Sequence, residues 1–175
     1  MGVSIALQRA ESLIASIPDY PKPGVLFRDI APLLADGPAF DVTVRALIEP
    51  FAGDFDVVAG VDARGFILAG AAASQTKAGF LPVRKKGKLA RPAFSAEYEL
   101  EYGTATLQVQ NDVKAGSKVL LIDDVLATGG TISAAAKMIE QLGLELIGVA
   151  VLFEIDGLGG RAKLEDRYLH TVFKG

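Results

Sequence analysis

The stretch VLLIDDVLATGGT, residues 119–131, decides the fold. It opens with four apolar residues in a row, which is typical of a buried strand in a parallel sheet. Two adjacent aspartates follow, and after them comes a turn rich in glycine and hydroxyl groups. A helical run over residues 132–142 comes next and stops at Gly143. The order of strand, paired acids, turn and helix predicts one strand–helix unit of an α/β sheet.

The turn in this stretch has the composition of a phosphate cradle. Paired glycines let the main chain curl so that several N–H groups point into one concavity. The start of the following helix adds unpaired N–H groups and the positive end of its dipole, and the two threonines add hydroxyl donors. The residues that we expect to bind phosphate are Ala127, Thr128, Gly129, Gly130 and Thr131. A plain strand-to-helix turn without a ligand is the alternative.

The two carboxylates, Asp123 and Asp124, do not suit a phosphate site unless another part of the ligand needs them. Ribose hydroxyls are hydrogen-bond donors, and Mg²⁺ prefers oxygen ligands. The unit therefore predicts a ribose 5-phosphate, with its phosphate in the turn and its hydroxyls or a metal at the acids. It does not match a P-loop, because the pattern GxxxxGK[ST] is absent.

Length and composition limit the other possibilities. The 175 residues suit a single domain, residues 1–175, large enough to bury roughly 70% of the surface of the unfolded chain. Half of the residues are hydrophobic, and the net charge of −3 argues against a general binder of nucleic acids. Cysteine is absent, which excludes disulfides and thiol catalysis.

Neither a secretory signal nor a membrane span is evident in the sequence. Residues 1–17 are interrupted by Gln8, Arg9 and Glu11, so that no charged start is followed by a continuous apolar block. No run of about 18 apolar residues occurs anywhere in the chain. We therefore expect a soluble cytoplasmic protein without a membrane partner.

The N-terminal part of the chain contains a candidate base pocket. Apolar spacing predicts a helix over residues 5–17, ended by Pro18. Further along, Phe27 stands next to Arg28. Either Phe27 is a core residue and Arg28 pairs with Asp29, or this segment offers an aromatic face and main-chain hydrogen-bonding groups to a base.

A second predicted buried strand, residues 55–61, is followed by a helix of small residues, 66–74. Asp62, Ala63 and Arg64 lie between them. Because the carboxyl ends of parallel strands face the usual ligand crevice, Arg64 is a candidate ligand contact. A surface ion pair between Asp62 and Arg64 is the alternative.

Five cations crowd into residues 84–91, directly after a short predicted strand over 80–83. Such a run is usually a solvated loop or a nucleic-acid patch. In an otherwise acidic protein, a basic loop that closes over a polyphosphate explains it better. Alternation over residues 104–110 predicts a strand antiparallel to its neighbour, so that 84–106 is expected to form a flexible β-hairpin flap.

Two further elements, a helix over 38–51 and a strand over 146–153, continue the alternation of strands and helices. Short loops between such elements predict an α/β fold, a mostly parallel twisted sheet with helices on both faces. We assign no role to the tail from Arg161, which contains His170, the only histidine.

Several short motifs resemble one family. IDDVLATGGT resembles the phosphoribosyl pyrophosphate signature of the type I phosphoribosyltransferases, and PGVxFRDI, DxRGF, RKxGKL and LEYG resemble their adenine branch. One departure is Ala90-Arg91, where the family usually has a proline after KL. The resemblance implies the type I fold with a small N-terminal hood, approximately residues 1–35. It also implies a homodimer in which the basic loop lies near the partner subunit.

The implied reaction is transfer of the 5-phosphoribosyl group from phosphoribosyl pyrophosphate to adenine, giving AMP and pyrophosphate, with Mg²⁺ as cofactor. The substrate would hold the metal, with the two aspartates nearby and no certain direct protein ligand. One alternative is a type I enzyme for another purine, such as xanthine or hypoxanthine. A lesser alternative is a non-catalytic sensor of phosphoribosyl pyrophosphate.

The resemblance also implies roles for individual residues. The catalytic residues would be Glu101, Arg64, Asp123 and Asp124, with Glu101 transferring a proton at the base. The implied pyrophosphate site is Asp62, Ala63, Arg64, Lys85 and Lys88, with the Asp62–Ala63 peptide expected to be cis. The implied adenine site is Leu26, Phe27 and Arg28. Tyr102 would order the closed loop.

Overall fold

The computed structural model describes residues 4–20, 22–99, 104–164 and 167–175. The chain divides into two compact units, Met1–Ala46 and Leu47–Gly175. None of the helices in the described part of the chain has the length and apolarity that a membrane span requires.

The first unit is built on a two-stranded antiparallel sheet. Its elements are α1 (Ile5–Ser12), β1 (Ala15–Pro18), β2 (Leu26–Asp29), α2 (Ala31–Ala35) and the start of α3 (Gly37–Ile48). The predicted helix over 5–17 is therefore wrong in its second half. Helical spacing continues past Ser12, but β1 pairs with β2 from Ala15 to Pro18, and this non-local pairing overrides the local pattern.

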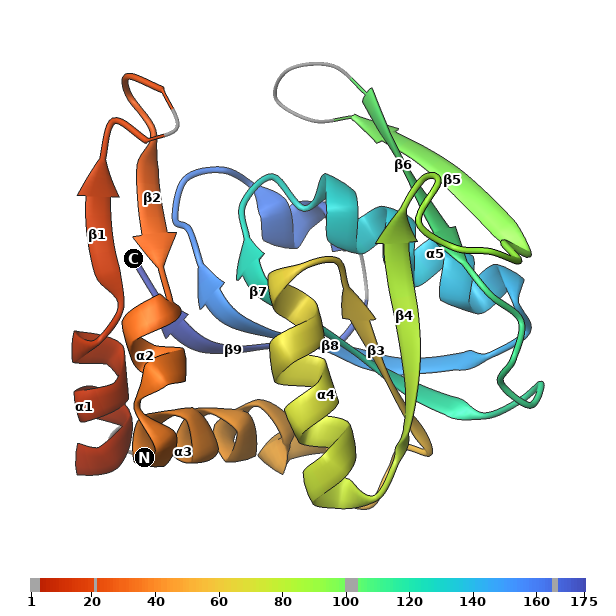
Figure 1. Ribbon diagram of the computed structural model, residues 1–175, viewed down its shortest axis with the longest axis horizontal. Helices are drawn as coiled ribbons and strands as arrows, with labels where there is room; N and C mark the ends of the chain where they lie inside the picture. The colour runs from red at the N-terminus through yellow and green to blue at the C-terminus, as the bar shows by residue number, and fades with distance from the viewer. Residues whose placement is uncertain (1–3, 21, 100–103, 165–166) are drawn as a thin grey trace. The chain divides into compact units, whose positions relative to one another are not determined.

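The second unit is built on a seven-stranded sheet with the order β5-β6-β4-β3-β7-β8-β9 (Figure 1). Strands β4, β3, β7, β8 and β9 run parallel, and β6 runs antiparallel to β4 and β5. This arrangement confirms the predicted α/β class. The elements are η1 (Glu49–Phe51), β3 (Val57–Val61), α4 (Arg64–Thr76), β4 (Gly79–Lys85), β5 (Phe94–Glu99), β6 (Thr104–Val109), β7 (Lys118–Leu126), α5 (Gly130–Gln141), β8 (Glu145–Glu154), η2 (Gly160–Leu164) and β9 (Leu169–Lys174).

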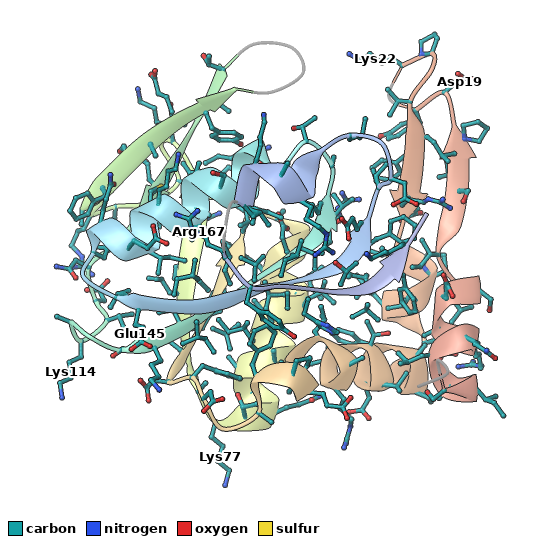
Figure 2. All side chains as sticks on the ribbon, turned by 180° about the vertical axis from the view of Figure 1, so that it is seen from behind. Asp19, Lys22, Lys77, Lys114, Glu145 and Arg167 are labelled. Atoms are coloured by element: carbon teal, nitrogen blue, oxygen red, sulfur yellow. The ribbon has the colours of Figure 1, made fainter. Side chains whose placement is uncertain are left out.

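Helices α4 and α5 cover opposite faces of this sheet (Figure 1). Alternate strand residues, such as Ala59 and Leu121, pack with Met138 of α5 in the main core. On the other face α4 comes so close that a Cβ added to Gly60 would lie 2.7 Å from the Cβ of Ala69. The helix ends at Lys77, a left-handed C-cap whose side chain projects away from the protein (Figure 2).

Two elements differ from the sequence-based expectation in ways that matter for the site. Strand β7 runs on to Leu126, because β8 pairs with it as far as Glu154, so the two acids lie inside the strand and not after it. Helix α4 begins at Arg64 and not at Phe66. Strand β9 was not predicted at all: it is a short edge strand that pairs in parallel with β8, and its own sequence gives little sign of that partner.

Candidate functional site

A cavity of about 390 Å³ lies at the carboxyl ends of β3 and β7. Residues predicted for the site from different parts of the sequence meet here. They are Asp62, Ala63, Arg64, Lys85, Asp123, Asp124 and Thr131, together with the apolar or aromatic Val61, Tyr98 and Ala105. The sheet brings them together because parallel strands place their carboxyl ends along one edge.

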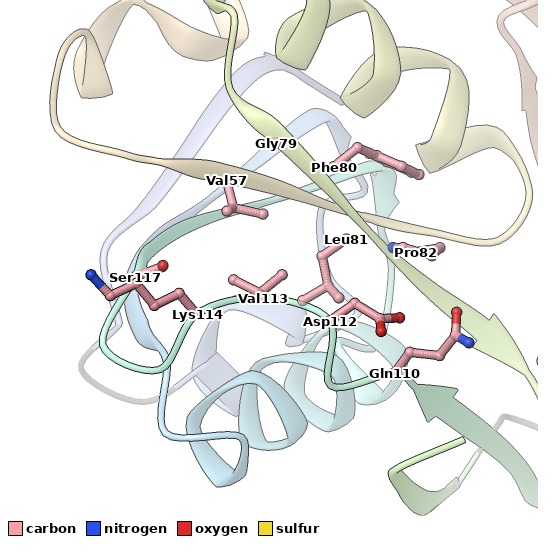
Figure 3. Close-up of a pocket in the computed structure, with 10 residues that line it drawn as sticks. All are labelled: Val57, Gly79, Phe80, Leu81, Pro82, Gln110, Asp112, Val113, Lys114 and Ser117. Carbon is pink, nitrogen blue, oxygen red and sulfur yellow. The ribbon is translucent and has the colours of Figure 1, made fainter. Parts of the chain in front are cut away.

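A second cavity, of about 320 Å³, lies near the opposite ends of the same strands (Figure 3). Its walls include Val57 and Gly79, the first residues of β3 and β4, and Ser117, which precedes β7. None of the residues predicted for the site lines it. Because ligands of open α/β sheets bind outside the carboxyl ends of the strands, the first cavity is the candidate active site.

The two aspartates are buried, and each is fixed by a close contact. Asp123 is 8% exposed and Asp124 is 6% exposed. The main-chain N–H of Asp124 donates to Oδ1 of Asp123 at 2.9 Å. Nε of Arg64 lies 2.7 Å from Oδ2 of Asp124, so the first residue of α4 forms an ion pair with a carboxylate inside β7.

Burial gives this acid pair unusual electrostatics. Loss of solvent raises the pKa of Asp123 well above its ordinary value, and the neighbouring charge of Asp124 raises it further. Loss of solvent also raises the pKa of Asp124, although the Arg64 guanidinium opposes the shift. Hydroxyl donors or a cation in the cavity would stabilise both carboxylates. The pair therefore suits a sugar or a metal better than a bare anion.

Gly65 is a site residue that sequence reasoning did not single out. A Cβ added at this position would lie 2.7 Å from Oδ1 of Asp123 and 3.2 Å from the carbonyl oxygen of Ile122. Only glycine lets the first turn of α4 approach the acids so closely. The motif DxRGF contained this residue, but its reason is visible only when α4 and β7 are placed side by side.

The segment after β3 contains a cis peptide bond between Asp62 and Ala63, as expected. The Asp62 carboxylate is 5% exposed and lies 3.3 Å from Nε of Arg84 and 3.4 Å from Nζ of Lys88. Lys88, expected to bind pyrophosphate, therefore pairs with Asp62 in this structure. Arg84 was not predicted for the site. It also donates to the carbonyl oxygen of Lys88 at 3.1 Å and lies over the ring of Phe66.

The turn from 127 to 131 joins β7 to α5. Its residue Gly129 has φ of +80° and occupies the N-cap position of α5. Because glycine has no side chain to cap the helix, N–H groups of the first turn remain for a ligand. Thr131 lies in this first turn and lines the cavity. This geometry is that of an anion-binding helix start.

Other predicted residues belong to the first unit of the chain or fall outside the described residues. Leu26, Phe27 and Arg28 all belong to β2 of the first unit, where the ring of Phe27 meets that of Tyr20 with centroids 5.1 Å apart. Glu101 and Tyr102 lie outside the residues that the structure describes. The roles expected for these residues stay predictions.

The described residues offer limited coordination for a metal. Within the ranges described above, no group of three or more acidic or histidine side chains is arranged to hold an ion. Asp123 and Asp124 provide carboxylate oxygens of the kind that Mg²⁺ prefers, but fewer than its octahedral shell requires. The two carboxylates alone do not make a closed protein site for such an ion.

Comparison with known proteins gives a consistent result. The family model described as phosphoribosyl transferase domain matches residues 34–173. The adenine phosphoribosyltransferase of Arthrobacter sp. (strain FB24) is 51% identical over 168 residues, 95% of this chain and 91% of the relative. That of Cutibacterium acnes is 53% identical over 155 residues, 88% of each chain.

Solved structures give the same picture. The crystal structure of adenine phosphoribosyltransferase from Rhodothermus marinus matches with a TM-score of 0.92 at 42% identity, over 97% of this chain and 98% of that chain. The enzyme from Saccharomyces cerevisiae, complexed with an imino-altritol bisphosphate and adenine, matches with a TM-score of 0.91 at 34% identity, over 97% and 99%. These similarities extend over both units of the chain.

Proposed function

This chain belongs to the adenine phosphoribosyltransferase family, and we propose its reaction from that premise. The chain is a pentosyltransferase that moves the 5-phosphoribosyl group of phosphoribosyl pyrophosphate onto adenine, giving AMP and pyrophosphate in purine salvage. The observation that carries the proposal is the single cavity around which Asp123, Asp124, Arg64 and Thr131 meet.

The turn 127–131 would anchor the 5-phosphate, far from the bond that breaks. Binding energy from this remote group can hold the sugar in a reactive orientation. Asp123 and Asp124 would accept hydrogen bonds from the ribose hydroxyls. As the bond from the anomeric carbon to pyrophosphate lengthens, its electron pair leaves with the pyrophosphate, and the same carboxylates stabilise the positive charge that develops on the sugar.

The leaving group needs positive charge. Arg64 and Lys85 line the cavity and would supply it, and Lys88 would join them by exchanging Asp62 for a pyrophosphate oxygen. Mg²⁺, held mainly by the substrate with Asp123 and Asp124 nearby, would supply further charge to the departing oxygens when bound. The new bond forms between the anomeric carbon and a ring nitrogen of adenine.

The base site stays a prediction from the sequence. Adenine would lie against Phe27, and main-chain groups of Leu26 and Arg28 would read its edge. Glu101 would take the proton that the base loses, and Tyr102 would help to order the closed loop.

We also propose that the chain forms a homodimer and is located in the cytoplasm. The homodimer stays a prediction from the resemblance, and Ile67 on α4 and Phe80 on β4 are among the exposed apolar side chains that a partner subunit could cover. Sedimentation of the purified chain would test it. The cytoplasmic location stays a prediction from the sequence, to be checked by fractionation of cells that express the tagged chain.

A purine panel with pyrophosphate release as readout tests the reaction. We expect turnover with adenine and little with hypoxanthine or xanthine, because a site built for an amino group leaves polar groups unpaired when an oxo group replaces it. Faster turnover of hypoxanthine would remove the adenine assignment. Binding of phosphoribosyl pyrophosphate without turnover of any base would favour the sensor.

A further inference from the structure

The back of the phosphate turn rests directly on another part of the main chain. A Cβ added to Gly129 would lie 2.5 Å from the carbonyl oxygen of Gly160, and one added to Gly160 would lie 2.2 Å from the carbonyl oxygen of Ala127. Real Cβ atoms do not approach other atoms so closely, so the two backbones pack with no room for a side chain. The position of Gly160, the first residue of η2, therefore restricts the position of the turn 127–131.

The residue next to Gly160 is held by a buried carboxylate. Glu154, 8% exposed, accepts from Nε of Arg161 at 2.9 Å and from a terminal nitrogen of Arg161 at 2.6 Å. The same carboxylate accepts from the hydroxyl of Thr171 at 3.1 Å and lies 3.4 Å from Nζ of Lys174. The Arg161 guanidinium, through its hydrogen bonds, lowers the pKa of Glu154 to about 2, so the pair is charged at any pH near neutrality.

Glu154 is also tied to the strand that leads into the turn. It stands opposite Leu126, the last residue of β7, and the N–H of Ile155 donates to the carbonyl oxygen of Leu126 at 3.0 Å. Between Glu154 and Gly160 the chain passes through an exposed loop in which Gly157 and Gly159 have positive φ. Such a loop gives little stiffness of its own. The Glu154–Arg161 ion pair therefore links the two ends of a flexible loop.

We propose that the Glu154–Arg161 pair is a positioning device that holds Gly160 against the back of the turn 127–131 and so presets the turn's N–H groups for a 5-phosphate. Both residues act through Gly160, and neither lines the cavity. The part of this inference that concerns the 5-phosphate rests on the proposed function.

Arg161→Ala is the test, and Arg167→Ala is its matched control. Arg167 (Figure 2) donates two hydrogen bonds of 2.8 Å to Glu140 on α5 and one of 3.4 Å to the carbonyl oxygen of Leu164, at the far end of η2 from Gly160. We expect Arg161→Ala to raise the Kd for ribose 5-phosphate and the KM for phosphoribosyl pyrophosphate about tenfold, since the loss of one hydrogen bond to a charged phosphate weakens binding by about this factor. The Kd for pyrophosphate, expected at Asp62–Arg64, should change less than about twofold, because the side-chain hydrogen bonds of Arg161 go to Glu154 and Thr171 and not to that segment.

Amide hydrogen exchange in the ligand-free protein gives a readout that does not depend on the reaction. Exchange at Ser133, whose N–H donates to the carbonyl oxygen of Gly129 in the turn at 2.9 Å, should be faster in Arg161→Ala than in the control. Arg161→Lys, which keeps the charge but not the fork of donors, should recover part of the protection. Unchanged exchange at Ser133 together with an unchanged Kd for ribose 5-phosphate, with only a lower Tm, would overturn the positioning role. A wild-type protein that makes no AMP would overturn the proposed function, and the exchange experiment would still decide the positioning role.

Discussion

Adding one methyl group at Gly65 should damage the site while leaving the rest of the fold intact. In Gly65→Ala the new Cβ would lie 2.7 Å from Oδ1 of Asp123, whereas ordinary van der Waals contact begins near 3.4 Å. The same oxygen accepts the main-chain N–H of Asp124 at 2.9 Å, so it cannot move away without weakening that hydrogen bond. Either α4 withdraws from the sheet, or the acid pair shifts.

The size of the effect follows from these distances. Relief of the contact needs a displacement of about 0.7 Å, taken up by buried groups that have little free space. Overpacking of this kind costs about 1–3 kcal/mol of unfolding free energy. A shift approaching 1 Å at a reacting centre can reduce turnover by about 100-fold. We expect turnover to fall by roughly tenfold to 100-fold, and the free energy of unfolding to fall by about 1–3 kcal/mol.

Gly70→Ala provides the control on the same helix, because a Cβ there meets nothing within 4 Å. It should keep full turnover and gain stability, since alanine favours a helix over glycine by roughly 0.5–1 kcal/mol. Pyrophosphate release at saturating substrate and thermal unfolding should be measured on both variants. The reasoning would be refuted by a Gly65→Ala enzyme with wild-type turnover and the same Tm as Gly70→Ala. That result would mean that a Cβ fits between α4 and the two acids.

Three further substitutions test the roles assigned to charges. Arg64→Ala should lose most turnover while AMP still binds, because Arg64 acts on pyrophosphate; equal loss of both would show that its ion pair with Asp124 is structural. Glu101→Gln should lower kcat more than it raises KM, and an unchanged rate would move the proton transfer to solvent or to the main chain. Asp123→Asn should abolish turnover and yet raise Tm at pH 7.5. Burial raises the pKa of Asp123 in the folded state, so wild-type stability falls as the pH rises from the unfolded pKa through the folded pKa. Because asparagine cannot ionise, the gain in Tm should shrink toward pH 4 in a melting series, and a lower Tm at pH 7.5 would contradict the assignment.

Much of the fold and part of the site could be predicted from local sequence. Residues 119–131 specify a buried strand, two acids, a glycine turn and a helix, because each depends on hydrophobic period or on backbone freedom over a few residues. The alternating strand predicted over 104–110 and its antiparallel pairing are confirmed, and they too could be predicted from a local hydrophobic period. The cis bond after Asp62 was expected from the resemblance of DxRGF to a family motif.

The remaining features needed the tertiary structure, because they depend on distances between segments far apart in the chain. Strand β9 exists because β8 offers it an edge, and the helical pattern after Ser12 gave way to pairing with β2. Lys88 is close to Asp62 only once β3 and β4 lie side by side. The requirement for glycine at Gly65 and Gly160 comes from what packs against each of them, α4 against the acids and η2 against the turn. Sequence period records which face of an element is buried, but not which atoms lie across the interface, and those atoms set the geometry of this site.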